Sequence, residues 1–176
     1  MKVKIGKYPK HRWYSNFLYE KFGWRNEPTI KVKIDEWDTW SMDHTLSHII
    51  LPMLKQLNKH KHGAPYVSLD DVPQDLWPPE GEVVPDGDTD SSFFKRWDWV
   101  MGEMIFAFQS KDDDWEARFS SGEHDMLTIK RDDGFHELVK GPNDTYKVDW
   151  EGRQAYQDRI SNGFRLFGKY YENLWD

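Results

Sequence analysis

The chain has 176 residues, a net charge of −7 and no cysteine, and 16% of its residues are aromatic. The absence of cysteine excludes disulfides and thiolate chemistry, and the negative charge argues against general nucleic-acid binding, which needs a basic face. No run approaches the roughly 18 apolar residues of a membrane span, and the first residues contain no apolar signal segment. We therefore expect a cytosolic protein that contacts no membrane.

Two short strands and a helix are predicted near the N-terminus. Residues 2–5 and 29–35 alternate apolar with charged side chains, so we expect two strands that pair with each other. Between them, apolar residues recur at helical spacing over residues 13–22, and Gly23 stands where a helix commonly ends.

A longer helix is expected from a cap at Asp38 or Ser41 to about His60, with Pro52 inside it. Its spacing predicts one apolar face, made of Met42, Leu46, Ile49, Ile50, Met53 and Leu57. Residues 63–90 follow as an acidic loop rich in proline and glycine, which we expect to be flexible.

The strongest element is a central helix over residues 91–110, which is apolar almost all the way round. Residues 126–139 indicate a hairpin that turns at Asp133 and Gly134, and a long final helix begins at Asp149. The predicted class is therefore α+β: one mainly helical domain over residues 1–176, with three long helices and a small antiparallel β element.

Three carboxylates stand in apolar helical surroundings and are the first candidate site residues. Glu103 and Asp98 interrupt the central helix, and Asp43 falls inside the predicted apolar face of the preceding helix. Buried acids either pair with an arginine, such as Arg159 or Arg96, or have shifted pKa values that mark a functional site. A cavity beside Glu103 would favour the second interpretation.

His44 and His48 are spaced so that both imidazoles could bind one metal ion, with a carboxylate such as Glu103 as third ligand. Asp43 and Glu103 are then the candidate catalytic residues of a metal-assisted hydrolase. Because no complete metalloenzyme motif is present, a solvated histidine pair is the simpler interpretation, and we expect neither a bound metal nor another cofactor.

The first 33 residues carry nine Lys and Arg against two Glu, a net charge of +7, so the remainder carries −14. Such asymmetry is typical of a site for an anionic ligand, or of one half of a self-complementary contact between copies of the chain. Cations and rings alternate around Lys10, Arg12, Trp13 and Tyr14, which suits a nucleotide: cations bind phosphate and a ring stacks on the base. We group these residues with Asp98 and Glu103 as candidate ligand contacts.

Several blocks of the chain resemble a family of small accessory proteins of tailed bacteriophages: residues 3–8, 38–46, 49–57, 71–73, 97–108, 162–171 and 174–176. The resemblance implies a protein made in the host cytoplasm that acts on host machinery or host defence. The leading hypothesis is a non-catalytic binding protein that sequesters an anionic, nucleotide-like defence signal. The hydrolase described above and an acidic inhibitor of a host protein are the alternatives.

Overall fold

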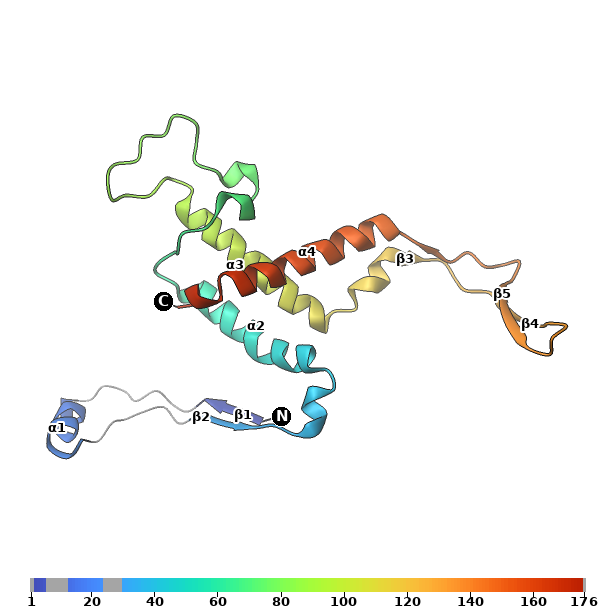
Figure 1. Cartoon of the computed structure of the whole chain (residues 1–176), viewed down its shortest axis with the longest axis horizontal. Helices are drawn as coiled ribbons and strands as arrows, with labels where there is room; N and C mark the ends of the chain where they lie inside the picture. Colours follow the sequence, from blue (N-terminus) through green and yellow to red (C-terminus); the bar gives the residue numbers. More distant parts are fainter. Residues whose placement is uncertain (1, 6–12, 24–29, 176) are drawn as a thin grey trace. The chain divides into compact units, whose positions relative to one another are not determined.

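The computed structural model describes residues 2–5, 13–23 and 30–175 (Figure 1). Its helices are α1 (Trp13–Phe22), α2 (Met42–His60), α3 (Phe93–Gln109) and α4 (Trp150–Lys169). The strands form short antiparallel pairs. The predicted class, α+β and mainly helical with a small β component, is confirmed. By its internal contacts the chain divides into two compact units, Met1–Leu46 and Ser47–Asp176.

The first unit contains the predicted strand pair. β1 (Lys2–Ile5) and β2 (Ile30–Lys33) are antiparallel and in the expected pairing. α1 stands between them in the sequence and stops at Gly23, whose φ of 62° is the left-handed conformation of a helix-ending glycine. The N–H of Gly23 donates to the carbonyl of Tyr19 at 2.9 Å, which closes the last turn. The 3-10 helix η1 (Glu36–Thr39) follows β2.

α2 has the predicted bounds and contains Pro52, but it packs on a different face from the one predicted. Three members of the predicted face are exposed: Met42, Leu46 and Met53. The residues that are buried or contact the core of the second unit are Ser47, Ile50, Leu51, Leu54 and Leu57. At about 100° per residue, this face is rotated by roughly a quarter-turn from the prediction. Apolar residues cover so much of α2 that their spacing allows two overlapping faces, and packing selects the one that includes Leu54.

α3 and α4 pack against each other along much of their length and form the centre of the second unit (Figure 1). Their shared core buries Trp97, Val100, Met101, Met104, Phe108, Leu166 and Tyr170. Gly163 of α4 allows the close approach, because a Cβ there would lie 2.5 Å from the Cβ of Ala107. None of the described helices combines the length and apolar character needed to cross a bilayer.

The segment predicted as a loop over residues 63–90 contains two short 3-10 helices, η2 (Leu69–Asp71) and η3 (Gln74–Leu76). Val67 and Val72 are buried in the same core as α3 and α4. The first half of the segment is therefore part of the packed body, whereas residues 78–89 are exposed along their whole length.

Two short 3-10 helices, η4 (Ser110–Asp112) and η5 (Trp115–Phe119), follow α3. The strands β3 (Ser120–Ser121) and β6 (Lys147–Val148) then pair and enclose the hairpin of β4 (Met126–Lys130) and β5 (His136–Lys140). This hairpin turns where predicted, at Gly134 with a φ of 86°.

Candidate functional site

Glu103 lies in the middle of α3 with its side chain only 8% exposed, and Arg159 of α4 binds both of its oxygens. Nε of Arg159 donates to Oε2 at 3.0 Å, and Nη2 donates to Oε1 at 2.7 Å. These hydrogen bonds raise the pKa of the Arg159 guanidinium, although burial acts in the opposite direction. The guanidinium also stands 3.9 Å from the ring centre of Phe106. Glu103 is thus the anchor of an interhelical ion pair rather than a carboxylate open to substrate.

The prediction that Asp98 and Asp43 are buried is wrong. Asp98 is 60% exposed and forms an ion pair with Lys61 of the second unit at 2.7 Å. It belongs to a solvent-facing stripe of α3 that continues through Gly102 and Gln109. Asp43 is also exposed, because it lies in the first turn of α2 and the buried residues of this helix begin only at Ser47.

The candidate histidines, His44 and His48, do not share a metal-binding cluster among the residues that the structure describes. Nδ1 of His48 lies 3.7 Å from Oδ2 of Asp112, and both side chains are well exposed. His44 is exposed as well. Within residues 2–5, 13–23 and 30–175, no group of three or more His, Asp and Glu side chains could hold a metal ion. Glu103, the carboxylate proposed as third ligand, is bound by Arg159.

The N-terminal candidates are only partly covered by the structure. Lys10 and Arg12 lie outside the described residues, and Trp13 is placed only as the first residue of α1. Tyr14 follows it in the helix with 37% of its surface exposed. Their proposed role in ligand binding therefore remains a prediction.

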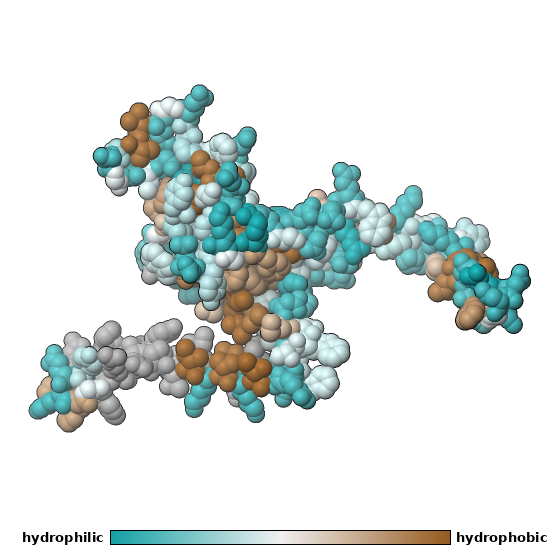
Figure 2. Space-filling model, viewed as in Figure 1, coloured by the Kyte–Doolittle hydropathy of each residue, from teal (hydrophilic) through white to brown (hydrophobic). Residues whose placement is uncertain are grey.

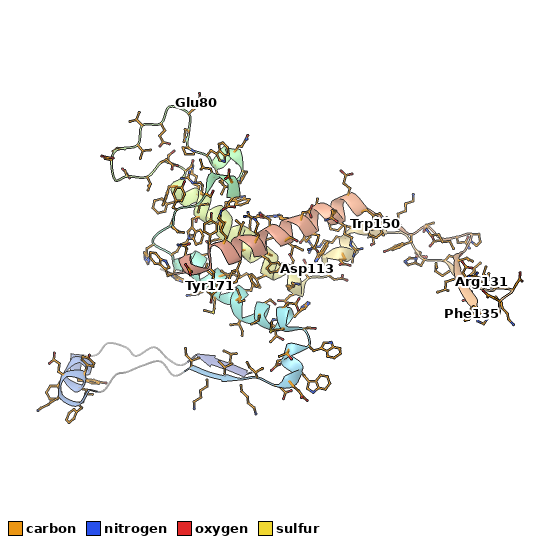
Figure 3. The ribbon with its side chains drawn as sticks, in the orientation of Figure 1. Glu80, Asp113, Arg131, Phe135, Trp150 and Tyr171 are labelled. Atoms are coloured by element: carbon orange, nitrogen blue, oxygen red, sulfur yellow. The ribbon has the colours of Figure 1, made fainter. Side chains whose placement is uncertain are left out.

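A pocket of about 360 Å³ opens on the solvent-facing stripe of α3. It is lined by Gly102, Ile105, Phe106, Gln109, Ser110, Asp113, Arg118 and Tyr156. The residues come from α3, the turns that follow it and α4, and Asp113 marks the place in Figure 3. None of these lining residues was among the predicted ligand contacts, although Gly102 and Phe106 lie in the predicted central helix.

The pocket has aromatic walls held by a stack of rings. Tyr156 lies parallel to Trp115 with ring centres 4.9 Å apart, and it meets Phe106 edge to face at 5.1 Å. Gly102 leaves space between these rings and solvent, since a Cβ at this position would meet nothing within 4 Å. The far side of Phe106 carries the Arg159 guanidinium, so the Glu103–Arg159 pair fixes one wall of the pocket.

The polar groups of the pocket include both donors and acceptors. Arg118 donates to the carboxylate of Asp113, and both side chains remain substantially exposed, at 55% and 39%. The amide of Gln109 is exposed and can both donate and accept. Ser110 already donates its hydroxyl proton to the carbonyl of Phe106 at 2.8 Å, which leaves its oxygen as an acceptor. The arrangement suits a flat ligand whose edge carries hydrogen-bonding groups of both kinds.

A second polar cluster, centred on Asp71 of η2, was missed by the sequence analysis. Its buried carboxylate accepts hydrogen bonds from Arg165 at 2.8 Å, from Lys169 at 2.5 Å and from the hydroxyl of Tyr170 at 2.6 Å. Burial raises the pKa of Asp71, but the three hydrogen bonds together outweigh it and hold the pKa below the usual value. Arg165 and Lys169 stand one turn apart at the end of α4 and Tyr170 follows directly, but nothing in the sequence links these donors to Asp71.

Asp71 joins the segment before η3 to the last turns of α4, and the hydroxyl of Tyr170 also accepts the N–H of Ser68 at 3.0 Å. Every polar atom of this cluster is therefore engaged within the chain, which is the mark of a structural junction rather than an open site. The pocket on α3 is the better candidate for function. Comparison of the chain with protein-family models, curated proteins and solved structures finds no match.

Proposed function

We propose that the chain is a non-catalytic binding protein whose pocket on α3 takes a small planar ligand of the nucleotide class. The observation that carries the proposal is the combination of aromatic walls, at Phe106 and Tyr156, with donors and acceptors at Gln109 and Asp113. Nucleobases need this combination, because they present a flat apolar face and an edge of alternating donors and acceptors. In the setting of a phage accessory protein, such a pocket would sequester a host defence signal.

Arg118 is the proposed contact for the anionic part of the ligand. Its ion pair with Asp113 is half-exposed, and exposed pairs contribute only about 0–1 kcal/mol. A phosphate can therefore replace the carboxylate at small cost, and it offers the guanidinium a bidentate acceptor. Arg159 supports the site indirectly, since it remains bound to Glu103 while it covers Phe106.

The first test is isothermal titration calorimetry of the full chain against mononucleotides and cyclic nucleotides. The decisive variant is Gly102→Met, which places a side chain in the pocket. Gly168→Met is its matched control, since Gly168 is also an exposed helical glycine whose Cβ would meet nothing within 4 Å. Both variants replace an exposed helical glycine with the same side chain, but only Gly102→Met should weaken binding, on the order of tenfold or more.

A second pair of variants tests the contact with the anionic part of the ligand, because the two changes should shift the affinity in opposite directions. Arg118→Gln should weaken binding of phosphorylated ligands, whereas Asp113→Asn should strengthen it because Arg118 is then unopposed. Neutral nucleosides should respond to neither change in charge. Absence of heat with every nucleotide, or binding that Gly102→Met leaves intact, would overturn the proposed function.

A further inference from the structure

The hairpin of β4 and β5 exposes an unusual amount of apolar surface. In the part of the chain that the structure describes, the two strands pair only with each other. Every residue of both strands except Val139 is exposed, including Met126, Leu127, Ile129 and Leu138. Figure 2 shows these apolar residues on the surface of the hairpin, and Figure 3 places Arg131 and Phe135 at its turn. A sheet of two strands with so little burial is marginal by itself, and further strands or a packing partner would stabilise it.

The base of the hairpin is held by a dense set of polar contacts. Asp144, whose side chain is 3% exposed, accepts the N–H of Asp125 at 3.2 Å and pairs with Lys140 at 3.2 Å. The rings of His124 and Tyr146 stack with their centres 3.7 Å apart. The two strands are therefore presented by an ordered base, as an interaction surface requires.

The hydrogen bonds at both ends of the hairpin show which backbone groups face outward. Arg131 donates to the carbonyl of Phe135 at 2.8 Å, and Gly141 donates to the carbonyl of Asp125 at 2.7 Å. Bonded and non-bonded pairs alternate along an antiparallel ladder, so the odd-numbered residues of β4 bond to β5. The N–H and C=O groups of Met126, Thr128 and Lys130 consequently point away from β5, along the free edge of β4.

This edge is complementary to itself. If a second copy pairs antiparallel about a two-fold axis at Thr128, the two Thr128 residues lie opposite each other, and Met126 of one copy faces Lys130 of the other. Leu127 then packs against Ile129 on the apolar face, and the outward backbone groups of both strands are all paired. No like charges meet.

The free edge of β5 does not have this property. The same operation about Leu138 would place His136 of one copy against Lys140 of the other, so two basic side chains would meet at each end. Lysines on an edge strand are a common means of preventing strand addition. The charge pattern therefore distinguishes the two edges of one hairpin.

We infer that β4 pairs with β4 of a second copy, so that two hairpins form one four-stranded antiparallel sheet and the chain is a homodimer. The sheet would bring Leu127, Ile129 and Val139 of both copies together on one face, which Glu137 shares opposite Ile129. The inference is independent of the pocket on α3 and of the ligand proposed for it.

Analytical ultracentrifugation of the full chain tests this directly, and we expect a species of twice the 21.1 kDa of one chain. Because Thr128 faces itself, any charge placed there meets the same charge. Thr128→Lys and Thr128→Glu should each raise the dimer dissociation constant about tenfold. A one-to-one mixture of the two variants should form a heterodimer again, because Lys then faces Glu.

Leu138→Lys is the matched control, since it adds the same charge to an outward position of the same hairpin but on β5. It should leave the dimer intact, and circular dichroism should show that all three variants keep their fold. A monomeric wild-type chain would overturn the inference, as would capture of a foreign extended peptide in place of a second copy. A dimer that survives Thr128→Lys, or a mixture that stays monomeric, would overturn it as well.

Discussion

Gly163 of α4 lies directly against Ala107 of α3. A Cβ on Gly163 would stand 2.5 Å from the Cβ of Ala107 and closer still to the carbonyl oxygen of Glu103. Real side chains do not approach to such distances, so the helices cross where they do because this position lacks a side chain. The same crossing places Arg159 on Glu103 and Tyr156 beside Phe106. The geometry of the pocket thus depends on one glycine that does not line it.

Gly163→Ala should therefore destabilise the chain although alanine favours helix. The helix gains about 0.5–1 kcal/mol from the change, but forcing apart two packed helices costs typically 1–3 kcal/mol or more. Gly168→Ala is the matched control and should stabilise by about 0.5–1 kcal/mol, since its Cβ meets nothing within 4 Å. Urea denaturation followed by circular dichroism measures both. Equal stabilisation by the two changes would contradict the close crossing.

The secondary structure could largely be read from the sequence because local signals determine it. Alternation predicted β1 and β2, Gly23 predicted the end of α1, and Gly134 predicted the turn between β4 and β5. What the periodicity could not supply was the rotation of α2. The helix is apolar over more than one side, and only tertiary packing distinguishes the side with Leu54 from the side with Met53.

The candidate site was predictable only in part. A carboxylate in an apolar helix needs a partner, so the pairing of Glu103 with an arginine was foreseeable, and Arg159 had been named. The pocket depends on residues far apart in the sequence, such as Phe106, Arg118 and Tyr156, which helical spacing cannot bring together. The junction at Asp71 was missed for the same reason, since its partners lie nearly a hundred residues away.

Replacing Arg159 should destabilise the chain more than replacing its partner Glu103. Arg159→Met leaves a carboxylate that is only 8% exposed without its cation, whereas Glu103→Gln leaves a half-exposed guanidinium that water can solvate. We expect a loss of about 2–4 kcal/mol for Arg159→Met and about 1 kcal/mol for Glu103→Gln. Thermal and chemical denaturation of both variants test the order. A larger loss for Glu103→Gln would contradict the asymmetry of burial.

Asp71 should contribute to stability at neutral pH and lose that contribution in acid. Its hydrogen bonds lower its pKa in the folded state below the ordinary value of 3.8 for an aspartate. A carboxylate with a depressed folded pKa stabilises above its unfolded pKa, and the effect disappears as the pH falls through the folded pKa. Asp71→Asn should therefore cost about 1–3 kcal/mol at neutral pH, with the difference from wild type shrinking below about pH 4.

Glu116→Gln is the control for this measurement, because Glu116 is also paired with a cation, Arg153, but both side chains are substantially exposed, at 55% and 32%. It should change stability by less than about 0.5 kcal/mol. Denaturant titrations at a series of pH values give both curves. A difference between wild type and Asp71→Asn that persists unchanged into acid would show that the ionised carboxylate is not what stabilises the junction.

Tyr170 should give the opposite pH dependence at the alkaline end. Burial and its hydrogen bond to Asp71 raise the pKa of its phenol to about 12. Since this folded pKa exceeds the unfolded value of about 10, the neutral hydroxyl stabilises the fold below pH 10. That contribution is lost as the pH rises through about 12. Tyr170→Phe should cost about 1–3 kcal/mol at neutral pH, because the carboxylate of Asp71 loses one donor and the N–H of Ser68 loses its acceptor.

The ionisation itself can be observed through the absorbance of tyrosinate. In an alkaline titration, the wild-type chain should show a tyrosinate component near pH 12 that comes from the raised pKa of Tyr170, and this component should be missing from Tyr170→Phe. Tyr171→Phe is the neighbouring control: Tyr171 is 63% exposed, so its removal should leave the late component in place. If the late component survives Tyr170→Phe, the phenol of Tyr170 is not held by Asp71. The junction between α4 and the segment before η3 must then depend on Arg165 and Lys169 alone.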